Sequence, residues 1–254
     1  MSGSVRSDET NLGGQLTWPR LLLLHLGPGA VAMGFTLAGA PLARRVGVPP
    51  DLALLAGSGV VAVAIRIGYL LHLGRTVSGG YSLRDVVGYR ARLPAWRFLG
   101  LFGLGVALGL GLYFVLTPVS NFLATRAFGW LPFYLLPSWD PVHAGFGRGV
   151  LLVYLATQLI FNCLVAPVAE EMYFRGNLLP RMAPTKGPWA PVVSSALFAV
   201  QHFWQPFDAP FLFLFWLGFG PIIMRTRCLK LGIALHITSN VLGLAPVILA
   251  LARL

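Results

Sequence analysis

Residues 98–117 read FLGLFGLGVALGLGLYFVLT, twenty consecutive residues without a charged side chain. A helix needs about 20 apolar residues to cross the hydrocarbon core of a bilayer. Comparable apolar runs lie near 20–42, 52–74, 149–172, 188–204, 209–224 and 231–252. The sequence therefore predicts an all-α fold, a polytopic transmembrane helix bundle with seven or eight spans.

The composition excludes a water-soluble globule. Of the 254 residues, 56% are hydrophobic and only 11% are charged, whereas a soluble domain carries about 25% charged residues. Short connections between the spans leave no room for a soluble domain of about 100 residues. We expect a polar, disordered tail over residues 1–18 and a single transmembrane domain over 19–254.

The net charge of +11 is interpreted as a topology signal and not as a nucleic-acid site, because the basic residues lie in short loops between apolar runs. With the N-terminus inside, thirteen of the 19 Lys and Arg fall on the inner side and five on the outer side. Inner loops are usually the more basic, so the N-terminus is predicted to be cytoplasmic. The largest basic cluster would then lie on anionic lipid; it comprises Arg75, Arg84, Arg90, Arg92 and Arg97. The use of 17 Arg against 2 Lys favours a GC-rich bacterial genome, and hence a bacterial inner (plasma) membrane.

Two adjacent glutamates follow the apolar run 159–168. Ionisable groups within a span are costly and are functional candidates by default. In the stretch EEMYFR, Glu171 and Arg175 are four residues apart and share one helix face. Glu170 points about 100° away and lacks that partner, so it is the candidate for proton transfer, while Glu171 and Arg175 brace the site. The alternative is an ion-pair network without chemistry.

Three further polar residues lie in apolar segments, namely His202, His236 and Asn240. Lys186, in the turn after the fourth span, is sixteen residues from both Glu170 and His202. If both arms are antiparallel helices, these two side chains lie at the same depth, about 24 Å along each arm. His236 and Asn240 are four residues apart on one face of the last span. Such a pair can donate hydrogen bonds to an oxyanion or join two helices.

Two other features have a simpler interpretation. Arg66 interrupts the second span; it could pair with an acid across the bundle, but we favour a side chain that extends to the inner face. Gly105 and Gly109 form a GxxxG pattern in the third span. This pattern indicates close helix packing, which we expect within the chain and not between two copies.

Three motifs follow one another along the chain: Glu170-Glu171-x-x-x-Arg175, Phe198-x-x-x-His202 and His236-x-x-x-Asn240. This order resembles the three ordered motifs of the CPBP membrane proteins, also called the Abi or type II CAAX-protease family. The resemblance covers roughly residues 150–245, within a protease-like core at about 148–245. It implies an intramembrane endopeptidase with Glu170, His202, His236 and Asn240 as catalytic residues. Glu170 and His202 would activate a water, and His236 with Asn240 would stabilise the oxyanion.

An older description of the same family is a metalloprotease, in which zinc would be held by Glu170, His202 and His236. A three-ligand zinc site is chemically reasonable, but the sequence has no HExxH motif. We therefore favour a site without a metal or other cofactor. The expected partners are membrane lipid and a peptide or protein substrate at the membrane, with no nucleic acid.

Two other functions compete with proteolysis. One is a non-catalytic membrane scaffold or immunity protein that uses the same fold to bind a partner. The other is a transporter, which Arg66 and Glu170 would suit, although the sequence has no visible inverted repeat. The sequence leaves open the physiological substrate, whether that substrate is prenylated, and the oligomeric state.

Overall fold

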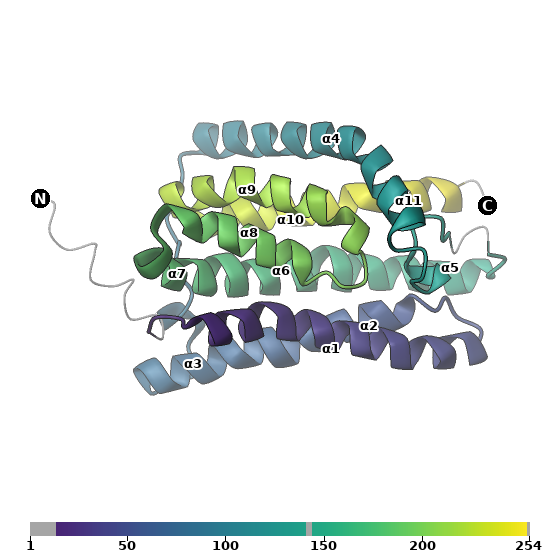
Figure 1. The fold of residues 1–254 in the computed structure, drawn as a ribbon, viewed down its shortest axis with the longest axis horizontal. Helices are drawn as coiled ribbons and strands as arrows, with labels where there is room; N and C mark the ends of the chain where they lie inside the picture. Colours follow the sequence, from purple (N-terminus) through teal and green to yellow (C-terminus); the bar gives the residue numbers. More distant parts are fainter. Residues whose placement is uncertain (1–13, 141–143, 253–254) are drawn as a thin grey trace, which may run out of the picture.

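The computed structural model describes residues 14–140 and 144–252, which form a bundle of helices lying side by side (Figure 1). This part of the chain contains no β-strand. α1 covers Trp18–Arg45 and α4 covers Ala95–Arg126. Between them, one continuous rod is made of α2 (Leu52–Val60), the π-helical η1 (Val61–Ile67) and α3 (Gly68–Ser78).

A second long rod opens the other half of the chain. It joins α5 (Arg148–Thr157), η4 (Gln158–Val165), α6 (Ala166–Glu170), η5 (Glu171–Leu178) and α7 (Leu179–Lys186). Gly187 has a positive φ of 52°, which glycine adopts readily, and the chain turns back there. The remaining helices are α8 (Ala190–Val200), α9 (Ala209–Thr226), α10 (Leu229–Gly243) and α11 (Ala245–Leu251).

Five helical stretches among the described residues are long and apolar enough to cross a membrane, fewer than the seven or eight spans predicted. They are 18–45, 52–78, 95–126, 148–200 and 206–226. The predicted span 149–172 lies in the stretch 148–200 and the predicted span 188–204 begins in it; this stretch contains the reversal at Gly187. The predicted span 231–252 is divided between α10 and α11, which are 15 and 7 residues long.

The middle of the bundle is formed by α6, α8, α9 and α10, with α4 along one edge and α1 and α3 along the other (Figure 1). Gly105 of α4 allows close approach, because a Cβ there would overlap the Leu235 side chain of α10. A Cβ at Gly109 would lie 3.2 Å from Phe215 of α9. The GxxxG pattern thus packs α4 against its own chain, as predicted.

The segment 79–94, which has no α-helix and one short 3₁₀ turn, η2 (Leu83–Asp85), crosses one end of the bundle, and we call it the strap. Its Gly88 amide donates to the Gly176 carbonyl at 2.7 Å, and its Tyr89 carbonyl accepts from the Leu229 amide at 2.7 Å. Val86 and Val87 are buried. The strap therefore joins η5 to the start of α10 and is part of the core, in addition to carrying basic residues.

Candidate active site

Glu170 has a charged partner, contrary to the prediction that it would be unpaired. Its Oε1 lies 2.9 Å from Nη1 of Arg66, and both side chains are buried. Arg66 also donates from Nη2 to Oε1 of Gln201 at 3.1 Å. The prediction that Arg66 extends to the inner face was wrong, because a guanidinium in the membrane is better compensated by a carboxylate than by a long reach to water.

Local helix geometry helps to bring these two residues together. Arg66 lies in the π-helical turn η1, and Glu170 ends α6 immediately before the π-helical η5. π-Helical turns add a residue to a helical repeat and are frequent at functional sites. A shift of this kind changes which side chains face the neighbouring helix, so an ideal helical wheel does not predict the pair.

Glu171 has the structural contacts that the sequence predicts. Its Oε1 accepts from Nη1 of Arg175 at 3.0 Å and lies 3.0 Å from Nδ1 of His236. The Arg175 guanidinium stacks between two rings, 3.9 Å from the centroid of Phe198 and 3.7 Å from that of Trp216. Planar stacking of this kind suits arginine. Glu171 and Arg175, both in η5, therefore hold the His236 ring of α10 in place.

His236 lies between the two glutamates. Since a carboxylate can only accept, Nδ1 carries a hydrogen toward Glu171, and Nε2 lies 3.8 Å from Oε2 of Glu170. A neighbouring carboxylate commonly sets the tautomer and orientation of a functional histidine in this way. The second ring nitrogen is thereby directed toward the side of Glu170 that Arg66 does not occupy.

His202 lies in the turn that follows α8, although the sequence placed it inside a helical span. Its Nδ1 donates to the Phe198 carbonyl at 2.7 Å, so in the neutral ring Nε2 is the acceptor. The position of this turn depends on Gly29 of α1, where a Cβ would overlap the Gln201 carbonyl oxygen. α1 thus contributes to the site by packing directly on the backbone beside His202.

One cavity of about 320 Å³ is lined by all four residues predicted to be catalytic. These are Glu170, His202, His236 and Asn240. Asn240 donates from Nδ2 to the Asn162 carbonyl at 2.7 Å, and a primary amide has a second N–H for another acceptor. Arg66 and Gln201 do not line the cavity, so Arg66 contacts Glu170 from outside the cavity, and Gln201 contacts Arg66.

The residues do not fit a zinc site in this arrangement. Among residues 14–140 and 144–252, no three His, Cys, Asp or Glu side chains come close enough to hold one metal ion. The guanidinium of Arg66 also occupies Oε1 of Glu170. Because a cation at that oxygen opposes a second cation beside it, the arrangement disfavours zinc at Glu170.

Sequence reasoning did not find the role of Arg66 and passed over Gln201. A signal for Arg66 was present, since it is a charged residue within a span and therefore a candidate by default. Gln201 precedes His202 and is fully buried, but it is uncharged and belongs to none of the three motifs, so the sequence did not single it out. His143 lies outside the described residues.

Comparison with known families agrees with the motifs. Residues 152–242 match the family model of the Rce1-like type II CAAX prenyl endopeptidases. This match confirms the resemblance to the CPBP/CAAX-protease family, and the matched segment includes all four cavity residues named above. It supports an integral membrane protein with protease activity. No curated protein and no solved structure gave a significant match.

Proposed function

We propose, from the match of residues 152–242 to the type II CAAX prenyl endopeptidase family, that this chain is an intramembrane endopeptidase that hydrolyses a peptide bond with a water held by Glu170 and His202. The observation that carries the proposal is the single cavity lined by Glu170, His202, His236 and Asn240. These side chains come from three segments that are far apart in the sequence. A chance meeting of unrelated polar residues would not reproduce the order of the family's three motifs.

Each residue has a role that its contacts allow. Oε2 of Glu170 and Nε2 of His202 are acceptors that can bind one water and remove its proton as the water oxygen attacks the substrate carbonyl carbon. The proton then passes to the leaving amine as the C–N bond breaks. Asn240 through its second N–H, together with the His236 ring that lines the same cavity, can stabilise the tetrahedral oxyanion.

Glu171, Arg175, Arg66 and Gln201 are positioning residues. Glu171 and Arg175 orient His236, while Arg66 holds Oε1 of Glu170 and donates its other Nη hydrogen bond to Gln201. With Oε1 held, Oε2 is the oxygen left for the water. This division of the carboxylate supports a general base in a defined orientation, and it uses no metal.

Quantitative mapping of protein termini tests the proposal without a known substrate. Host cells would carry the wild-type chain, Glu170→Ala or His202→Ala at matched abundance. We expect new termini with the wild type that are absent with either variant. Identical termini in all three strains, under conditions where another wild-type phenotype is present, would contradict proteolysis and favour a scaffold or immunity protein.

A further inference from the structure

One face of the second rod, α5 to α7, lines the catalytic cavity at regular intervals. Gln158, Asn162, Ala166 and Glu170 all line the cavity and are spaced four residues apart. In an ideal α-helix, with about 100° per residue, residues twelve apart point about 120° away from each other. The wider π-helical turns of η4 offset this drift. Gln158 therefore shares the cavity with Glu170, about 15–18 Å away along the rod.

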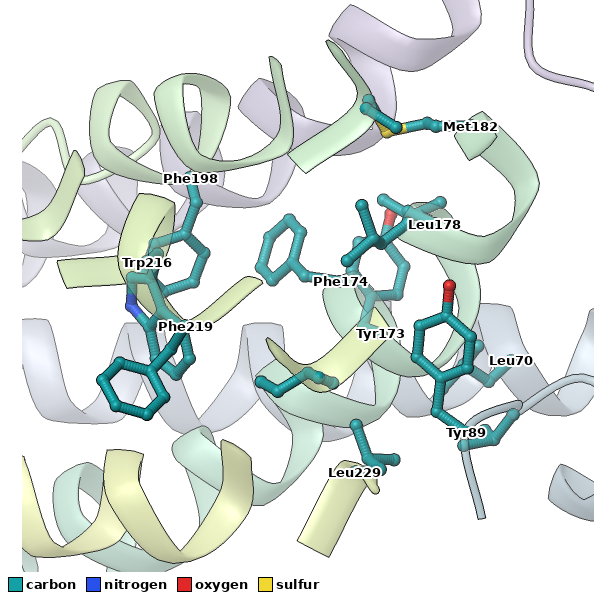
Figure 2. Packing of buried hydrophobic residues seen from close by; sticks show 14 of the residues in the cluster. Leu70, Tyr89, Tyr173, Phe174, Leu178, Met182, Phe198, Trp216, Phe219 and Leu229 are labelled. Carbon is teal, nitrogen blue, oxygen red and sulfur yellow. The ribbon is translucent and has the colours of Figure 1, made fainter. Parts of the chain in front are cut away.

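The part of this rod that follows Glu170 has a different environment. Figure 2 shows Tyr173, Phe174 and Leu178 of η5 packed in the hydrophobic core, and all three side chains are buried. None of residues 171–186 lines the cavity. A further binding group on this rod therefore has to lie before Glu170.

Gln158 is the last member of a buried hydrogen-bond chain. The Tyr154 hydroxyl donates to Oδ2 of Asp51 at 2.6 Å, and Nε2 of Gln158 donates to the Tyr154 oxygen at 2.7 Å. All three residues are buried. Asp51 immediately precedes α2, whereas Tyr154 and Gln158 belong to α5 and η4. The chain therefore connects the two long rods beside the cavity.

The direction of these hydrogen bonds fixes the orientation of the Gln158 amide. An ionised Asp51 can only accept, so the single hydroxyl hydrogen of Tyr154 points to Asp51 and the Tyr154 oxygen accepts from Gln158. The amide nitrogen is then held at Tyr154, and Oε1 is the atom left for another partner. Oε1 is buried and has no hydrogen-bond partner among the described residues. A buried acceptor without a partner is rare in a folded protein and needs a specific explanation.

A polypeptide substrate supplies the kind of group that this oxygen lacks. Each residue of a peptide other than proline carries a main-chain N–H, and an N–H that enters a buried cavity has to be hydrogen-bonded there. Leaving it without an acceptor is costly. The amide of Gln158 is held in place before the substrate arrives, which lowers the entropic cost of binding.

We propose that Gln158 is a substrate-binding residue, whose Oε1 accepts a hydrogen bond from a donor group of the polypeptide about five residues from the scissile bond. This inference rests on the proposed protease function. The spacing follows from the separation of about 15–18 Å between Gln158 and Glu170 along the rod and a rise of about 3.3 Å per residue in an extended chain. Tyr154 and Asp51 are positioning residues for the amide. None of these three residues belongs to the three motifs found in the sequence.

Cleavage of a modified peptide series by the purified protein in liposomes tests this contact. The parent peptide covers a cleavage site found by terminus mapping. One set carries a single backbone N-methyl group at successive positions, which removes one main-chain N–H at a time. A second set replaces each hydrogen-bonding side chain with alanine. The two sets distinguish a main-chain donor from a side-chain donor.

Three variants complete the design. Gln158→Leu removes the acceptor, and Tyr154→Phe removes the oxygen that orients it. Thr157→Val is the matched control, because it is adjacent in the chain but does not line the cavity. Unfolding temperatures check that each variant is folded. Tyr154→Phe keeps Gln158, so it carries the test if Gln158→Leu is unstable.

For the wild type, we expect one modification to lower kcat/KM by about 3- to 10-fold through a higher KM, the size of one lost hydrogen bond. Gln158→Leu should lower kcat/KM for the parent peptide by a similar factor and should not respond further to that modification. Tyr154→Phe should respond less than the wild type, and Thr157→Val should match the wild type.

A wild-type response to every modification in Gln158→Leu or Tyr154→Phe would overturn the inference. A fall in kcat at unchanged KM in Gln158→Leu would also overturn it, since it would indicate a role in the chemical step. If the wild type cleaves no such peptide, the protease proposal fails, and this inference fails with it. If the wild type cleaves the peptide and Gln158→Leu behaves identically, only this inference fails.

Discussion

The buried ion pair between Arg66 and Glu170 gives the sharpest quantitative prediction. Its nitrogen and oxygen are 2.9 Å apart, and the two side chains are only 2% and 7% exposed. At that distance and an effective dielectric constant of about 20, the Coulomb attraction is about 6 kcal/mol. Desolvation of both charges offsets much of this attraction, but removing one partner of such a pair still costs about 3–5 kcal/mol.

Arg66→Met should therefore destabilise the protein by about 3–5 kcal/mol, because Glu170 is left as an uncompensated buried charge. For a chain of this size the loss corresponds to a fall of roughly 6–20 °C in unfolding temperature. The double variant Arg66→Met/Glu170→Gln removes both charges and should recover more than half of the loss. The exposed Arg97→Met is the matched control and should change stability by less than about 0.5 kcal/mol.

The assay is thermal unfolding of the purified variants in one detergent, arranged as a double-mutant cycle with Glu170→Gln as the fourth member. The coupling energy from this cycle isolates the pair from the other contacts of either residue. If the loss of stability in the double variant equals the sum of the losses in Arg66→Met and Glu170→Gln, the coupling is zero. The assignment of Arg66 as the partner of Glu170 would then be refuted.

Three further changes have defined outcomes. Gly29→Ala should lower the stability of the fold by about 1–3 kcal/mol and abolish cleavage, because its Cβ overlaps the Gln201 carbonyl. The control Gly34→Ala, in the same helix, should do neither, because no described atom lies within 4 Å of its Cβ. Unfolding temperature and terminus mapping test both variants. Arg175→Lys should lower the unfolding temperature despite keeping its charge, since an ammonium does not stack as a guanidinium does, and normal stability would contradict the stacking argument. Burial raises the pKa of Asp51, in the connection before α2; the folded state therefore holds this proton more tightly than the unfolded state, and stability should fall as pH rises from about 4 through the raised pKa. Asp51→Asn should flatten that part of the curve of unfolding temperature against pH, and an unchanged curve would count against the buried carboxyl.

Much of the fold follows from hydropathy alone. The apolar runs give the helices, and Gly187 gives the reversal between α7 and α8. The helix boundaries were less predictable, because the hydrophobic signal ends where the lipid ends while helices such as α4 continue to Arg126. The strap was not predictable, since its backbone is held by hydrogen bonds to residues far away in the chain, such as Gly176.

The residues that line the candidate site were predictable because ionisable and amide side chains are conspicuous in apolar segments. Glu170, His202, His236 and Asn240 do line one cavity. The partner of Glu170 was not predictable, because the choice between Arg66 and no partner depends on how two distant helices are rotated. The π-helical turn at η1 changes this rotation. Spacing rules for ideal α-helices do not include π-helical turns, so they do not predict which way Arg66 faces.

The most direct test of the central claim is cleavage by the purified protein in liposomes. The substrate would be a peptide that covers a cleavage site found by terminus mapping. We predict that the wild type cleaves it with or without a chelator, and that Arg66→Met/Glu170→Gln, folded but without the carboxylate, does not. Cleavage by that double variant at the wild-type rate would contradict Glu170 as the general base.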